Sequence, residues 1–234
     1  MLHFGNYGIT SNIAFPQKLA WERKEIDTDP LGNDEVGDCT IAAPGHAIQN
    51  MTMVANWSRP TQVTKDMCVK AYSDVTGYKP SDPSTDQGAN MTDVCAYLKT
   101  TGLAGFTFDG WVALDHTNVD QIKAANFIFG WVYFGISVPD KLADALNGPV
   151  PPVWNYKLFG SNPSGEGHAL GMFGHGKYGL AFNSWGLWLH MDWDFWLANV
   201  DEAYALVSKA WLKQSGISPS GFDYESLLND LQHV

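Results

Sequence analysis

The stretch Gly37–Gln49, GDCTIAAPGHAIQ, places a cysteine where a Gly-Asp turn gives way to small and apolar residues that favour a helix. A thiol at a helix N-terminus lies near unpaired backbone N–H groups and the positive end of the helix dipole. Both features favour the thiolate, which is the nucleophilic form of cysteine. Taken alone, Cys39 fits better an ordinary buried thiol, because free cysteine packs as a small hydrophobic residue.

Apolar residues recur on every side of the segment that follows Thr40, so the pattern predicts a buried central helix. Pro44 limits where this helix begins, because proline is tolerated in the first turn of a helix and breaks its interior. The helix should therefore begin at or just after Cys39. His46 lies on the same helical face as Cys39, but we expect it to face the core as a structural residue.

The composition is that of a globular protein. The chain has 234 residues, of which 45% are hydrophobic, and this length suits one large domain or two lobes that share a core. With 14 basic and 25 acidic residues the net charge is −11. This balance argues against nucleic acid or an anionic membrane as partner, since both are bound through basic clusters.

The first ten residues, MLHFGNYGIT, lack the charged and apolar regions of a signal peptide. No apolar run approaches the roughly 20 residues of a membrane-spanning helix. We therefore expect a cytoplasmic or virion-associated protein. The three cysteines make no disulfide framework; Cys68 and Cys95 either pair with each other or remain two separate thiols.

Helical patterns dominate the first half of the chain and strand patterns the second, which predicts an α+β fold. We expect a single domain over residues 1–234, with an N-terminal arm (1–36), a helical lobe (about 37–128), a sheet lobe (about 129–200) and a C-terminal helical extension (200–234). The helices are expected at 62–75, 90–100, 117–128, 200–214 and 223–233; strands are expected over most of 130–198, including 131–138, 168–173 and 178–182, with a loop at 148–166.

A cysteine nucleophile needs a nearby histidine and a third group that orients the imidazole ring. The candidates are His168, between Gly167 and Ala169, and Asn183, which begins Asn-Ser-Trp-Gly. His168 follows Cys39 by roughly 130 residues, which matches the interval of about 130–150 residues in papain-like enzymes. Gly-His-Ala followed by Phe-Gly-His-Gly and Asn-Ser-Trp-Gly resembles the second half of the papain-type cysteine peptidase signature. Residues 86–102 also resemble the glycine loop and following helix of that family.

The resemblance implies a papain-like two-lobe fold and a thiol-dependent hydrolase that cleaves peptide or protein substrates through an acyl-enzyme, without a cofactor. Cys39 would be the nucleophile, and His168 its ion-pair partner and later the general acid. Asn183 would accept the ring N–H of His168, and Trp185 would shield that hydrogen bond. Asn33 would form the oxyanion hole with the Cys39 N–H. Five residues would contact an extended peptide substrate, by backbone or as pocket walls: Gly88, Ala89, Met91, Ala169 and Trp185. Val138, at the end of an expected strand, would contribute to the same pocket as Met91 and Ala169.

The sequence also departs from this family around the cysteine. The family's Gly-Ser-Cys-Trp is Gly37-Asp38-Cys39-Thr40 here, and a carboxylate beside a thiol raises the pKa of that thiol. Asn33 stands where the family has the longer glutamine. These departures indicate a divergent bacterial or phage-type member. They leave an alternative, an inactive papain-like domain that binds other proteins, for example in a phage particle.

Other side-chain clusters are weaker candidates. The spacing of the histidines and aspartates in the second half is not a recognised metal-ligand pattern, so no metal is expected. Asp192 and Asp194 share one face of an expected strand, but paired-carboxylate chemistry needs a separation across a cleft. The histidines and aspartates considered as metal ligands are His168, His175, His190, Asp192 and Asp194.

Overall fold

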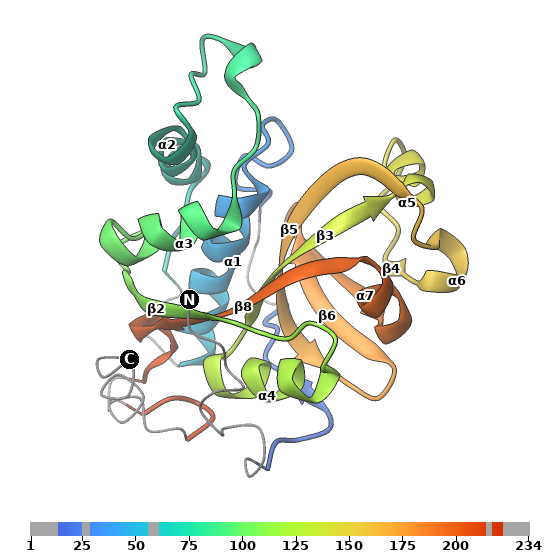
Figure 1. The fold of residues 1–234 in the computed structure, drawn as a ribbon. Coiled ribbons are helices and arrows are strands. Elements are labelled where there is room, and N and C mark those ends of the chain that lie inside the picture. The colour runs from blue at the N-terminus through green and yellow to red at the C-terminus, as the bar shows by residue number, and fades with distance from the viewer. Residues whose placement is uncertain (1–13, 25–28, 56–60, 214–216, 222–234) are drawn as a thin grey trace.

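The computed structural model describes residues 14–24, 29–55, 61–213 and 217–221. A group of helices lies beside a curved sheet, with helix α1 between the other helices and the strands (Figure 1). The helical lobe contains α1 (Cys39–Val54), α2 (Lys65–Thr76), the short 3-10 helix η3 (Pro83–Thr85) and α3 (Met91–Thr100). The expected α+β class is confirmed.

Among the described residues, eight strands form one sheet in the order β2-β8-β3-β5-β6-β7-β4, and β1 pairs with β5. Neighbouring strands are antiparallel except β4 and β7, which are parallel. The strands are β1 (Leu19–Ala20), β2 (Phe108–Ala113), β3 (Val132–Pro139), β4 (Val153–Trp154), β5 (Pro163–His175), β6 (Gly179–Ser184), β7 (Leu187–Asp192) and β8 (Val200–Ser208). The helices around the sheet are α4 (Val119–Phe129), α5 (Asp140–Ala145), α6 (Tyr156–Phe159), α7 (Trp193–Asn199) and the 3-10 helix η4 (Lys209–Trp211).

Helix α1 begins at Cys39, as expected, but Pro44 lies beyond its first turn. Proline has no N–H, so the carbonyl of Thr40, four residues earlier, loses its helical donor. The buried hydroxyl of Tyr133 on β3 donates to this carbonyl at 2.8 Å. A residue of the sheet thus supplies the hydrogen bond that the proline removes, and it ties α1 to β3.

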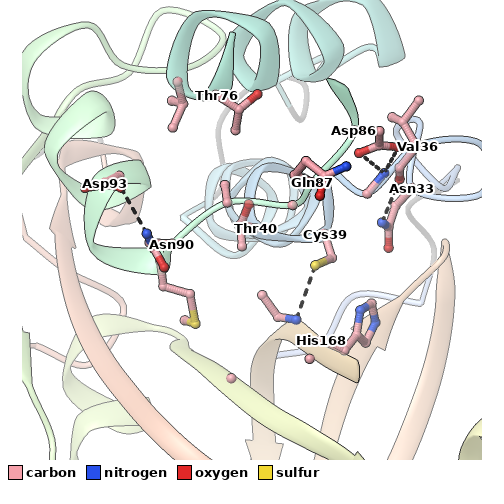
Figure 2. A pocket seen from close by; sticks show the side chains of 18 of the residues that line it. Asn33, Val36, Cys39, Thr40, Thr76, Asp86, Gln87, Asn90, Asp93 and His168 are labelled. Carbon is pink, nitrogen blue, oxygen red and sulfur yellow. Dashed lines mark hydrogen bonds between the residues drawn. The ribbon is translucent and has the colours of Figure 1, made fainter. Parts of the chain in front are cut away.

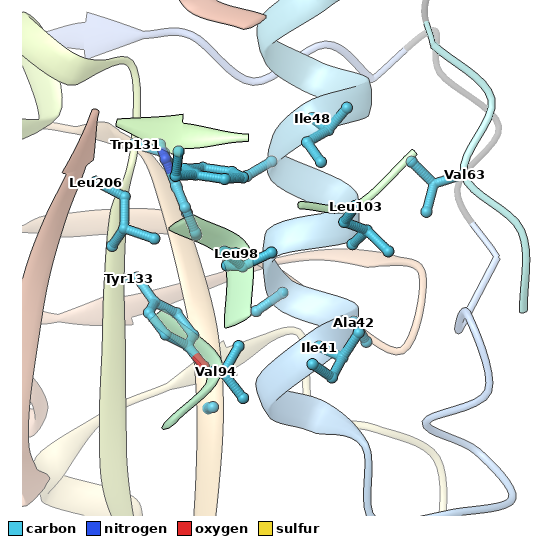
Figure 3. Close-up of a cluster of buried hydrophobic side chains, with 14 of the residues drawn as sticks. Ile41, Ala42, Ile48, Val63, Val94, Leu98, Leu103, Trp131, Tyr133 and Leu206 are labelled. Atoms are coloured by element: carbon cyan, nitrogen blue, oxygen red, sulfur yellow. The ribbon is translucent and has the colours of Figure 1, made fainter. Parts of the chain in front are cut away.

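Two hydrophobic clusters stabilise the molecule. One fills the space between α1, the other helices and the sheet, and Figure 3 shows Ile41 and Ile48 of α1 in this cluster with Trp131 and Tyr133. The second lies within the sheet lobe and contains large rings, among them Phe134, Trp154, Phe182 and Trp196. Nearly every residue of α1 is buried, which confirms the predicted central helix.

The prediction of a helix at 200–214 is wrong. Residues Val200–Ser208 form β8, which lies between β2 and β3 in the sheet. A strand with neighbours on both sides and both faces covered has a nearly continuous apolar sequence, and such a run is hard to distinguish from a buried helix. The part of the expected extension at 223–233 lies outside the described residues.

The helices expected at 62–75, 90–100 and 117–128 are confirmed as α2, α3 and α4. Strand β2 was not expected, and it brings residues from the expected helical lobe into the sheet. The short helices α5, α6 and α7 interrupt the region expected to be mainly strands and loop. In the described parts of the chain, no helix has the length and apolarity needed to cross a membrane.

Candidate active site

A cavity of about 850 Å³ lies where the helical lobe meets the sheet. Its lining includes Cys39 and Thr40 at the start of α1, and His168 and Ala169 on β5 (Figure 2). The loop that precedes α3 contributes residues 86–90, and Gly135 of β3 contributes to the opposite side. The structure therefore brings the expected nucleophile and the expected histidine to one cavity.

Cys39 is the first residue of α1 and is partly exposed, whereas Cys68 and Cys95 are buried free thiols. The backbone N–H of Ala169 donates to the Cys39 sulfur at 3.5 Å. Burial raises the pKa of the Cys39 thiol, and the charge of Asp38 raises it further, while the Ala169 N–H acts in the opposite direction. The resting nucleophile at neutral pH is therefore the thiol.

Asp38, the residue that precedes α1, is fully buried. Its two carboxylate oxygens have no hydrogen-bond partner in the described structure, and its side chain does not cap the helix. A side-chain oxygen of Asp38 approaches the position that a Cβ on Gly32 would occupy, so the carboxylate turns back toward that glycine. Burial raises the pKa of this carboxyl to about 7.

The His168 ring is held from two sides. Its Nε2 atom lies 2.8 Å from the hydroxyl of Ser184, and the indole of Trp185 stacks on the ring with centroids 4.6 Å apart and planes within 11°. Burial lowers the pKa of His168 to about 4. The imidazole is therefore neutral at neutral pH and can accept a proton from the thiol.

Ser184, and not Asn183, is the residue that contacts the ring. In the β5–β6 pair Asn183 is opposite Gly171, and successive side chains of a strand point to opposite faces. His168, three residues before Gly171, lies on the other face, which Ser184 shares. Asn183 is 1% exposed, and its amide oxygen and nitrogen have no hydrogen-bond partner in the described chain.

The hairpin that joins β6 to β7 places Trp185 directly after Ser184. Ser184 pairs with Leu187, so only Trp185 and Gly186 form the turn. Both have left-handed backbone angles, with φ of 50° and 74°, as a two-residue turn of this twist requires. A tryptophan is costly in that conformation, and here its ring is placed against the imidazole.

Asn33 lines the cavity near Cys39, and its side-chain amide donates to the carbonyl of Val36 at 3.3 Å. The Asn33 side chain also interacts with the Asp38 carboxylate, where it acts against the rise in the pKa of that group. The N–H of Cys39 belongs to the first turn of α1, whose N–H groups lack acceptors within the helix. Both expected oxyanion donors thus lie at the cavity.

A carboxylate that sequence reasoning did not single out connects the two loops at the cavity. Asp86 accepts the N–H of Gly37, at 2.9 Å to its nearer oxygen, and the hydroxyl of Tyr72 at 2.6 Å. The Tyr72 oxygen in turn accepts the N–H of Gly88 at 2.8 Å. This Asp86 network fixes the Gly88 loop relative to the turn before Cys39. In the sequence, the only feature that could have indicated this role of Asp86 was its position two residues before Gly88.

Gly88, Ala89, Met91 and Ala169 all line the cavity. Val138 does not: it is buried in the core of the sheet lobe, and Gly135 and Ile136 of the same strand face the cavity instead. The expectation that Val138 contributes to the pocket is therefore wrong, because the cavity crosses β3 nearer its middle.

The remaining histidines have structural contacts. His46 is buried, with Nε2 2.8 Å from the carbonyl oxygen of Asp29, which confirms its place in the core. His175 ends β5 and contacts Asn126 and the carbonyl of Pro16. Asp192 accepts the N–H of Phe195 at the start of α7. Among the described residues no group of three or more His, Cys, Asp or Glu side chains is arranged to hold a metal.

No protein-family model matches the chain, and the search of curated proteins found no match. Solved structures do match. Xylellain, a cysteine protease from Xylella fastidiosa, superposes with a TM-score of 0.64 at 16% identity, covering 86% of this chain and 88% of that one. The Carica candamarcensis cysteine protease CMS1MS2 gives 0.56 at 12% identity over 82% and 98% of the two chains. Digestive procathepsin L 3 of Tenebrio molitor gives 0.58 at 13% identity over 85% and 72%. The chain therefore shares the two-lobed fold of papain-like cysteine proteases.

Proposed function

We propose that this protein is a cysteine peptidase in which Cys39 attacks the carbonyl of a peptide bond and His168 transfers the proton. The observation that carries the proposal is the hydrogen bond from the Ala169 N–H to the Cys39 sulfur. It holds the sulfur against the strand segment that carries His168, at the wall of a cavity large enough for a peptide segment. The fold shared with the three cysteine proteases and precursors above supports the same reading.

The protonation states suggest how the reaction begins. The thiol of Cys39 and the imidazole of His168 are both neutral at rest, because burial disfavours the charged form of each. As the sulfur bonds to the carbonyl carbon, its proton passes to the imidazole, which acts as general base. The Cys39 N–H and the Asn33 amide donate to the developing oxyanion.

The tetrahedral intermediate then collapses. The carbon–nitrogen bond breaks, the imidazolium of His168 gives its proton to the leaving amine, and the acyl group remains on Cys39 as a thioester. Water, deprotonated by His168, attacks this thioester and releases the carboxylic acid, which restores the thiol. The ring must keep one orientation through both steps, and in this proposal Ser184 and Trp185 hold it.

Hydrolysis of a mixed peptide library by the wild-type protein and by Cys39→Ala tests the proposal. We expect cleavage by the wild type and none by the variant. In parallel, a small alkylating reagent should modify Cys39 before Cys68, and the modified protein should lose cleavage. A Cys39→Ala variant that cleaves as well as the wild type would overturn the proposal. An inert Cys39 in a protein that cleaves nothing would favour a binding or structural role.

A further inference from the structure

Three residues stand side by side on adjacent strands beside the nucleophile. Ala169 of β5 is opposite Gly135 of β3, and Gly135 is opposite Glu202 of β8. Directly opposed residues of antiparallel strands project to the same face, and neighbouring strands are about 4.8 Å apart. Glu202 therefore lies about 10 Å along this face from Ala169, whose N–H contacts the Cys39 sulfur.

The first two members of this row are small, so side chains of other residues pack over them. Gly135 has no side chain, and the position of an added Cβ would be 3.0 Å from Sδ of Met91, 3.1 Å from Cγ of Glu202 and 3.3 Å from Oδ1 of Asp201. These three side chains thus converge over Gly135. All of them, with Ala169, line the cavity. The result is a subsite beside Ala169 and Gly135 with a thioether wall (Met91) and a carboxylate end (Asp201, Glu202).

The charge around this subsite is of one sign. Among the described residues that line the cavity there is no lysine or arginine, and six are acidic: Asp34, Glu35, Asp86, Asp93, Asp201 and Glu202. Glu35 is paired with Lys65, and Asp86 is occupied by its network. The other four have no ion-pair partner in the described structure, and the Glu202 carboxylate accepts only a neutral donor, the Tyr204 hydroxyl, at 2.7 Å.

A separate observation also indicates a ligand at this cavity. Thr40 lines it next to Cys39, is 5% exposed, and its hydroxyl has no hydrogen-bond partner among the described residues. In Figure 2 its side chain lies between Cys39 and Asn90. A buried hydroxyl without a partner is costly, and a bound substrate would supply the missing contact.

We infer that the subsite formed by Ala169, Gly135, Met91, Asp201 and Glu202 binds a lysine or arginine side chain of the substrate. This inference rests on the proposed peptidase function and names its substrate class. The apolar stem of the basic side chain lies along Ala169 and the Met91 thioether, and its charged end reaches the two carboxylates. Peptides with a basic residue near the scissile bond are therefore the preferred substrates.

A positional series of fluorogenic peptides tests this. Each position is filled in turn with lysine, with norleucine, which keeps the stem without the charge, or with glutamate. For the wild type we expect one position at which lysine raises kcat/KM over norleucine by about fivefold or more, the value of a favourable partly exposed ion pair. Glu202→Gln should bring that ratio close to one. Asp144→Asn on α5, an exposed carboxylate away from the cavity, removes the same charge and should keep the ratio.

A second readout does not need turnover. Binding of fluorescent lysine and norleucine peptides to Cys39→Ala should show the same preference, weakened by Glu202→Gln and by salt, since added ions screen exposed charges. Cleavage by the wild type with equal rates for lysine and norleucine at every position would overturn the subsite and leave the peptidase intact. Preferential binding of lysine peptides without cleavage of any peptide would support the subsite and overturn the peptidase.

Discussion

The backbone N–H of Ala169 donates to the sulfur of Cys39 at 3.5 Å, a contact between residues 130 positions apart in the chain. It joins the first residue of α1 to the sheet, beside the ring that would receive the thiol proton. A backbone donor also stabilises negative charge on the sulfur, so it partly offsets the burial that raises the pKa of Cys39. The reactivity of the thiol therefore depends on how firmly this strand and helix are held together.

The contact between His168 and Ser184 predicts an unusual order of mutational effects. Ser184→Ala removes the hydrogen bond to Nε2 and should lower kcat by about tenfold or more, because a general base contributes fully only when it is oriented. Asn183→Ala, one residue earlier, should lower kcat less, since that side chain faces away from the ring. Steady-state kinetics and thermal unfolding of both variants provide the measurement. A larger kcat loss for Asn183→Ala at equal folding would contradict the assigned contact.

Asp38 predicts a specific dependence of stability on pH. Its pKa rises from 3.8 to about 7 on folding, so between these values the folded state holds more protons than the unfolded state. Stability therefore falls as pH rises from about 4 to 7, and the contribution is constant above that window. The full shift corresponds to a few kcal/mol. Between pH 5 and pH 8 the melting temperature of Asp38→Asn, measured by calorimetry, should thus fall less than that of the wild type.

The same substitution should change the thiol. Above pH 7 the ionised Asp38 raises the pKa of Cys39. At pH 8 a small alkylating reagent should therefore modify Cys39 faster in Asp38→Asn than in the wild type. At pH 5, where Asp38 is protonated, the two proteins should react at similar rates. Equal rates at both pH values would show that the carboxylate does not act on the sulfur.

Tyr133 predicts a stability effect that depends on a proline. Tyr133→Phe leaves the Thr40 carbonyl without a donor and should lower the free energy of unfolding by about 1–3 kcal/mol in denaturant titration. In a Pro44→Ala background residue 44 regains its N–H, which can donate to Thr40 within the helix. The cost of Tyr133→Phe should then be smaller. Equal costs in the two backgrounds would rule out this compensation.

The Asp86 network predicts a loss of activity without a large loss of stability. Asp86→Ala removes the acceptor for Gly37 and Tyr72, so the turn before Cys39 and the Gly88 loop lose their common support. We expect kcat/KM to fall by about tenfold or more, since small displacements in a catalytic site are costly. Asp82→Ala is the matched control: that carboxylate contacts only Ser84 in the same loop, and kcat/KM should stay within about twofold.

Local patterns predicted much of the fold. The start of α1 at Cys39 followed from the Gly-Asp turn, although Pro44 lies beyond the first turn where it was expected. The helices α2, α3 and α4 followed from their periodicity. The sequence of β8 led to the wrong prediction of a helix at 200–214, because a strand buried between two neighbours carries the same apolar run as a buried helix. Its place in the sheet depends on pairing with β2 and β3, which are distant in the chain.

For the site, the sequence by itself determined the chemical groups: one thiol at a helix start, one histidine after a glycine, and an Asn-Ser-Trp-Gly turn. The tertiary structure decided which of them meet. The pairing of β6 with β5 places Asn183 opposite Gly171, and alternation along the strand turns Ser184 to the imidazole and Asn183 away. Burial, which depends on how the two lobes pack, makes the thiol and the imidazole neutral. The spacing of residues in the sequence does not predict this burial.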